Sequence, residues 1–135
     1  MDWQFQINVL SNAQRVRPGF QLVAGNEYMV SAGANGATGM FTSLAGVAPR
    51  LMRRLYDVCR TEHYRDARSL QEDAAALRQA VKRAGFGGLK LALQLRGRDC
   101  GAPRPPMQPV ESAAAQRMSE ELAQLRFLDD EKPGW

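Results

Sequence analysis

Polar side chains that could contact a substrate follow the first of two short apolar segments. Asn26 and Glu27 come directly after the apolar run at residues 20–24, which we predict to be a buried strand. In α/β folds, ligands bind outside the carboxyl ends of the strands, so an amide and a carboxylate here are candidate binding groups. A structural role fits equally well, because Asn26 could cap the next helix and Glu27 would be favourable in its first turn.

A second candidate region follows the second apolar segment. We predict a strand at residues 37–43 and a loop at residues 44–48, and the stretch 42–47 is a candidate binding loop for the same reason. Gly33, Gly36 and Gly39 resemble a glycine-rich phosphate loop. They precede a strand and do not link a strand to a helix, so we predict tight turns and close packing there.

Other reactive side chains have structural interpretations. Lys90 lies among apolar residues and could in principle be an amine with a lowered pKa, but we expect it to reach solvent or pair with a carboxylate. Cys59 lies in a helical apolar stripe and is expected to fill the core. His63 is the only histidine and is expected to be a capping or surface residue. With one histidine and no CxxC pattern, we predict neither a metal site nor a disulfide framework.

Most of the chain is predicted to be helical. The alternation of strand, helix and strand in residues 20–60 predicts βα units and a parallel sheet, because parallel neighbours need a crossover between them. Two such strands cannot form a buried sheet by themselves. Outside the strands we predict helices at residues 2–16, 28–35, 49–60, 63–84, 89–95 and 112–125, a proline-rich connector at 101–109 and a frayed tail at 129–135.

The bulk composition fits an ordinary globular domain. The chain has 135 residues, 44% of them hydrophobic, and a net charge of +4. Its basic residues are scattered along helices among acidic ones, which indicates solvated helix faces and not a nucleic-acid surface. Glycines interrupt the least polar run, at residues 28–47, so we predict no membrane span. The first residues lack the pattern of a secretory signal, and we expect a cytoplasmic chain.

Five segments, in order, resemble one enzyme superfamily. They are GNEYMVSAGANGATG, VAPRLMRRLYDV, ARSLQEDAAALRQAV, FGGLKLALQLRG and PRPPMQPV. Together they resemble the C-terminal half of the dihydrodipicolinate synthase and N-acetylneuraminate lyase group of class I aldolases (DapA-like), with the ending closer to the lyase branch. The resemblance implies an α/β fold: a partial (β/α)₈ TIM barrel contributing its last two strands, plus a C-terminal helical bundle. Residues 1–60 would be the barrel segment from helix 6 to helix 8, residues 61–127 the helical extension and residues 128–135 a tail.

The resemblance also implies a chemistry whose nucleophile has no match in this chain. Family members form a Schiff base between a lysine on barrel strand six and pyruvate or another 2-oxo acid, and a tyrosine on strand four relays protons. They need no cofactor and no metal. Neither motif occurs here, so we assign no catalytic residue. The lysines and tyrosines that fall outside the two motifs are Lys82, Lys90, Lys132, Tyr28, Tyr56 and Tyr64.

The same resemblance assigns four substrate-binding residues. Asn26 and Glu27 match an acidic pair after strand seven that contacts hydroxyls of the bound sugar acid in the lyases. The family more often has Asp where this chain has Asn26, which replaces a charge-assisted hydrogen bond by a neutral one. Phe41 and Thr42, at the end of strand eight, match positions that line the pocket near the Schiff base.

Two hypotheses follow. The first is a fragment of a Schiff-base-forming 2-oxo-acid aldolase or lyase, inactive alone, whose parent enzyme acts on a 2-oxo acid or sugar acid. The second is a non-catalytic helical interaction module, residues 49–126, which docks on a homologous barrel. Exposed strand edges at residues 20–24 and 37–43 would require a partner, either another copy or a complementary half-barrel, and we expect no nucleic-acid or membrane partner.

Overall fold

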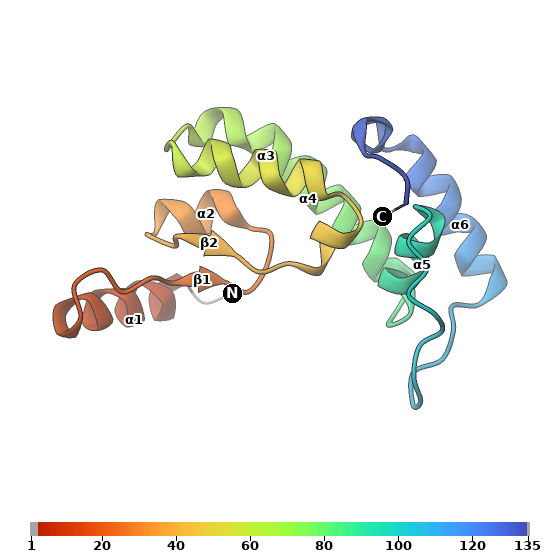
Figure 1. Cartoon of the computed structure of the whole chain (residues 1–135), viewed down its shortest axis with the longest axis horizontal. Helices are drawn as coiled ribbons and strands as arrows, with labels where there is room; N and C mark the ends of the chain where they lie inside the picture. The colour runs from red at the N-terminus through yellow and green to blue at the C-terminus, as the bar shows by residue number, and fades with distance from the viewer. Residues whose placement is uncertain (1–2, 135) are drawn as a thin grey trace. The chain divides into compact units, whose positions relative to one another are not determined.

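The computed structural model describes residues 3–134 and is mostly helical. The order of its elements can be followed along the colour ramp of Figure 1. The elements are α1 (Trp3–Val16), β1 (Val23–Ala24), α2 (Met29–Ala34), β2 (Gly39–Met40), the 3₁₀ helix η1 (Ser43–Gly46), α3 (Pro49–Arg60), α4 (Tyr64–Arg83), α5 (Gly88–Leu95), α6 (Ser112–Gln124) and the 3₁₀ helix η2 (Arg126–Asp130).

The two strands are parallel, as the βα alternation predicts. Val23 pairs with Gly39, and Ala24 with Met40. The ladder is short, and each strand has a single partner among the described residues. The hydrogen bonding continues one residue further, where the Phe41 N–H donates to the Ala24 carbonyl at 2.7 Å. The predicted strands are therefore present in the right places but are shorter than the apolar segments that indicated them.

The crossover between the strands is the short helix α2, which packs against β2. It ends at a turn where Gly36 has a φ of +89°, in the left-handed region that favours glycine. A Cβ at Gly36 would also overlap the side chain of Leu10 from α1. The predicted tight turn and close packing at this glycine are confirmed.

The described residues pack as two compact units. We call residues 3–42 with 53–71 the strand unit, and residues 43–52 with 72–134 the helical unit. Helices α3 and α4 each contribute one part to either unit. The predicted division into residues 1–60, 61–127 and 128–135 concerns the parent barrel and stays a prediction.

The strand unit has a small core of alanines. Ala24, Ala32 and Ala37 are buried together, and Trp3 packs against them. Helix α1 is tied to α2 by Gln6, whose side-chain amide donates to the Ala32 carbonyl at 3.1 Å. Several large apolar side chains of this unit are exposed all the same: Phe5, Ile7, Val16, Val23 and Phe41.

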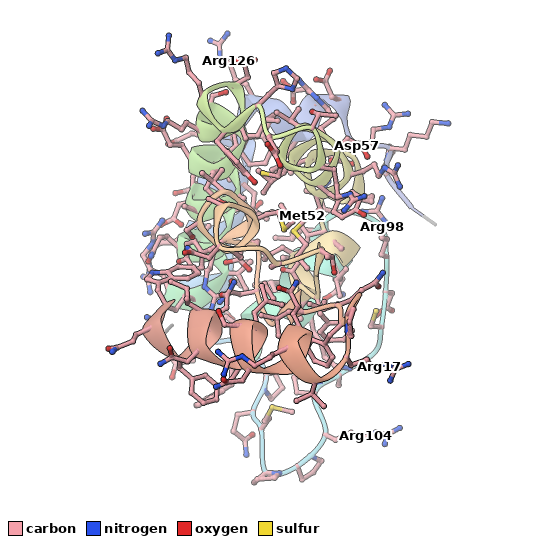
Figure 2. All side chains as sticks on the ribbon, turned by 90° about the vertical axis from the view of Figure 1, so that its left-hand side faces the viewer. Arg17, Met52, Asp57, Arg98, Arg104 and Arg126 are labelled. Carbon is pink, nitrogen blue, oxygen red and sulfur yellow. The ribbon has the colours of Figure 1, made fainter. Side chains whose placement is uncertain are left out.

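The helical unit is built on α5, which packs against both α6 and η1. Arg98, only 5% exposed, holds this packing from within. Its guanidinium donates to the carbonyls of Gly46 and Val47, each at 3.2 Å, and to that of Lys132 at 2.7 Å. Arg104 and Arg126, in contrast, point away from the ribbon into solvent (Figure 2).

The predicted frayed tail is wrong for the described residues up to 134. Leu128 and Glu131 are only 2% and 3% exposed. The Glu131 carboxylate accepts hydrogen bonds from the N–H groups of Arg50 at 3.1 Å and Leu51 at 2.7 Å. These two N–H groups lie in the first turn of α3, where N–H groups have no acceptor within the helix. The helix dipole also favours a negative charge at this end. The tail is ordered because it caps a helix 80 residues away in sequence.

Two other expectations can be compared directly with the described residues. The predicted loop at residues 44–48 contains the 3₁₀ helix η1. Within the described part of the chain, no helix is both long enough and apolar enough to cross a bilayer.

Candidate functional site

The carboxyl ends of β1 and β2 bring two of the four predicted site residues together. Because the strands are parallel, the segments that follow them leave the same edge of the sheet. The Thr42 hydroxyl, after β2, donates to Glu27 Oε2, after β1, at 3.1 Å. Glu27 is fully buried at 0% exposed. A carboxylate and a hydroxyl therefore meet where α/β proteins bind their ligands.

Asn26 has the structural role that its residue type also allowed. Its side-chain oxygen accepts a hydrogen bond from the Tyr28 N–H at 3.1 Å, which closes a local turn before α2. The Met29 N–H donates to the Glu27 carbonyl at 2.8 Å in the same turn. Asn26 is half-buried and shapes the loop that carries Glu27.

Phe41 is the least enclosed of the four residues. Its backbone extends the ladder from β2, but its side chain is 80% exposed. An exposed ring of this size beside a strand edge is the kind of surface that a neighbouring element normally covers.

Sequence reasoning missed Gln71, which lies in α4. Its amide nitrogen donates to the Glu27 carbonyl at 2.9 Å, and its amide oxygen accepts from the Val30 N–H at 3.1 Å. The sequence pattern of α4 does not distinguish Gln71 from Gln79, an exposed glutamine of the same helix. Only the folded chain brings it to the β1–α2 loop, 44 residues away in sequence.

The other reactive side chains have structural surroundings. Lys90 Nζ donates to three carbonyls, those of Cys100 at 2.9 Å, Gly101 at 3.2 Å and Ala102 at 3.2 Å, so the ammonium organises the connector after α5. Cys59 is buried, and burial raises the pKa of its thiol. Within residues 3–134, no group of three or more His, Cys, Asp or Glu residues is placed to hold a metal ion.

The cavities of the helical unit do not include the predicted site. One, of about 290 Å³, is lined by Lys90, Asp99 and the start of the connector. Another, of about 700 Å³, is an apolar groove whose lining includes Phe86, Met107 and Val110. None of Asn26, Glu27, Phe41 and Thr42 lines either cavity.

Residues 6–125 match the family model described as the dihydrodipicolinate synthetase family. The chain belongs to this family. It is 31% identical over 121 residues to a DapA-like lyase of Halobacterium salinarum, an alignment that covers 88% of this chain and 40% of the relative. It is 34% identical over 90 residues to the 4-hydroxy-tetrahydrodipicolinate synthase of Corynebacterium jeikeium, covering 66% of this chain and 30% of that enzyme.

The fold is similar to solved structures of the same family. The dihydrodipicolinate synthase of Thermotoga maritima superposes with a TM-score of 0.82 at 20% identity, over 93% of this chain and 43% of that one. The predicted family resemblance is thus confirmed, and the two parallel strands belong to a partial TIM-barrel-type fold. The chain spans 30–40% of the length of the curated relatives named above.

Proposed function

We propose that this chain supplies the substrate-tail side of the active site of a family aldolase or lyase. In the complete barrel, a lysine on strand six would form a Schiff base with a pyruvate-type 2-oxo acid. Glu27 and Thr42 would contact the rest of the substrate, a sugar acid or similar polyol acid. Helices α4 to α6 would be the C-terminal bundle appended to the barrel.

The observation that carries this proposal is the pair formed by Glu27 and Thr42. The carboxylate and the hydroxyl lie 3.1 Å apart at the ends of adjacent parallel strands. Active sites of (β/α)₈ barrels lie at this edge. A carboxylate accepts hydrogen bonds from substrate hydroxyl groups, and its charge strengthens such bonds. Asn26 would act on the substrate less directly, because its side-chain oxygen is engaged by the Tyr28 N–H.

We also propose that the chain alone does not form the Schiff base. Lys82 and Lys90 lie in α4 and α5, and Lys132 lies after η2. Lys90 Nζ is engaged in hydrogen bonds to three carbonyls of the connector that follows α5. The purified chain incubated with pyruvate and borohydride should gain no mass, while a complete family enzyme treated in parallel should gain the reduced adduct. A covalent adduct on Lys90 would contradict the proposal.

The substrate role is tested in a reconstituted barrel. The chain is co-expressed with a half-barrel that carries the first six strands of a family member, and release of pyruvate from 2-oxo sugar acids is measured. Glu27→Gln should lower kcat/KM by about tenfold or more, because it removes a charge-assisted hydrogen bond. Trapping of pyruvate itself should be unaffected, since pyruvate has no tail for Glu27 to bind.

The matched control is Glu72→Gln, an exposed carboxylate on α4. It should leave kcat/KM unchanged. If Glu27→Gln also leaves kcat/KM unchanged while pyruvate is still trapped, Glu27 does not bind the substrate tail and the proposed function is wrong.

A further inference from the structure

The side chain of Gln71 makes two hydrogen bonds to one short stretch of backbone. Its amide nitrogen donates to the Glu27 carbonyl at 2.9 Å, and its amide oxygen accepts from the Val30 N–H at 3.1 Å. Only a side chain that is donor and acceptor at once can make both bonds, and the glutamine amide is such a group. The pairing therefore requires a side chain that both donates and accepts, as the Gln71 amide does.

The Val30 N–H has a particular need for this partner. It lies in the first turn of α2, where N–H groups have no acceptor within the helix. No side-chain cap is supplied from the N-cap position of α2, which is Tyr28. A helix of six residues is too short to be stable by itself. The Gln71 oxygen thus supplies a cap that the local sequence does not.

A second contact from α4 supports the same helix. A Cβ at Gly33 of α2 would lie 3.4 Å from a ring carbon of Tyr64 and 3.4 Å from the Met29 methyl. Tyr64 is the first residue of α4, and burial raises the pKa of its hydroxyl. The first half of α4 therefore contacts α2 at two points, through the Tyr64 ring and the Gln71 amide.

Glu27 is consequently held through both its main-chain carbonyl and its side-chain carboxylate. Its carbonyl accepts from Gln71 and from the Met29 N–H at 2.8 Å. Its carboxylate accepts from Thr42. A shift of the β1–α2 loop that broke the first two bonds would also displace the residue that carries the carboxylate.

We propose that Gln71 is a positioning residue for Glu27, so that α4 sets the geometry of the substrate-tail site through the β1–α2 loop. This role rests on the proposed function, in which Glu27 contacts the substrate. It gives α4, which the family resemblance predicts to lie in an extension beyond the barrel, a direct part in substrate selection.

The first test uses the full chain and needs no substrate. Amide hydrogen exchange is followed by NMR in Gln71→Met, which has a similar shape but neither donor nor acceptor, and in Gln71→Glu, which keeps only the acceptor. We expect the Val30 amide to exchange about tenfold faster in Gln71→Met and to stay protected in Gln71→Glu. Gln79→Met, the exposed control on the same helix, should match the parent chain. Unchanged Val30 protection in Gln71→Met would overturn the inference.

The second test separates positioning from general stabilisation. In the reconstituted barrel, Gln71→Met should lower kcat/KM for the sugar acid severalfold and leave trapping of pyruvate unchanged, and Gln71→Glu should recover part of the loss. An equal loss for both substrates would indicate a merely structural role and overturn the inference. If Glu27→Gln has no effect on turnover but Gln71→Met still exposes the Val30 amide, the proposed function fails and the contact from α4 stands.

Discussion

The two units of this chain differ in the kind of group that each leaves uncovered. In the helical unit, distant segments satisfy one another, as the Arg98 guanidinium does with three carbonyls and Glu131 with the first turn of α3. In the strand unit, both strands have an unpaired edge among the described residues, and Phe41 is 80% exposed. The helical unit joins distant segments through internal polar contacts but leaves Phe86 93% exposed, whereas the strand unit leaves the edges of its two strands unpaired among the described residues.

This difference bears on the proposed function. A site at the end of two barrel strands needs neighbours on both sides to enclose a substrate. In the helical unit, the contacts of Arg98 and Glu131 are internal to the unit. We therefore expect substitutions in the helical unit to change stability and substitutions in the strand unit to change association and binding.

The largest effect is expected for Arg98→Met in the helical unit. It leaves three carbonyls without their donor, and we expect the free energy of unfolding to fall by about 3 kcal/mol. Urea denaturation followed by far-ultraviolet circular dichroism measures this. Arg104→Met, at a residue that points into solvent, is the control and should have no measurable effect. Equal effects of the two variants would mean that the buried hydrogen bonds of Arg98 do not stabilise the helical unit.

The next effect is expected for Glu131→Gln. The amide keeps one acceptor for the first turn of α3 but loses the second acceptor and the charge, so we expect a loss of about 1–2 kcal/mol. The amides of Arg50 and Leu51 should exchange faster with deuterium. Glu111→Gln is the control, because Glu111 stands at the start of α6 without capping it. Unchanged exchange at Arg50 and Leu51 would show that the tail does not cap α3.

A smaller effect is expected for Val23→Lys on β1, whose side chain is 55% exposed. A lysine on a strand edge opposes edge-to-edge pairing, so the dissociation constant for self-association should rise about tenfold, or roughly 1.4 kcal/mol. Sedimentation velocity measures it. Phe86→Lys tests the helical unit in the same way, because Phe86 is 93% exposed. A larger effect of Phe86→Lys would reverse the comparison between the units.

The smallest effect concerns the two thiols. Cys59 of the strand unit is buried and Cys100 of the helical unit is exposed, so a thiol reagent should modify Cys100 at once and Cys59 only upon unfolding. Because burial raises the pKa of Cys59, its thiolate is disfavoured in the folded state. The contribution of Cys59 to the free energy of unfolding is complete below the thiol pKa of the unfolded chain, about 8.5. It is lost as the pH rises through the higher pKa of the folded chain.

Cys59→Ala tests this pH dependence. The parent chain should lose stability above about pH 9, and the variant should lose less over the same range, as measured by urea midpoints at several pH values. An identical alkaline decline in the two chains would show that Cys59 does not contribute to it.

The sequence by itself determined the helices and the family. The helix predicted at residues 49–60 is α3 with the same bounds, because Pro49 suits a first turn and the apolar stripe of this helix is local information. The two strands were also placed correctly, since apolar runs between glycines and turns are local signals. Their lengths were overestimated, because ladder length depends on partners that a single segment does not reveal.

Only the tertiary structure decided which polar groups meet. Thr42 contacts Glu27 across 15 residues, Gln71 reaches Glu27 across 44, and Glu131 caps α3 across 80. Each contact depends on one polar side chain, which leaves no repeating pattern in the sequence. The same residue type could equally well point into solvent or bond to a buried partner. A pattern read over one turn of helix or a few residues of strand cannot encode such a contact. It arises when the chain excludes water from the group and leaves one partner within reach.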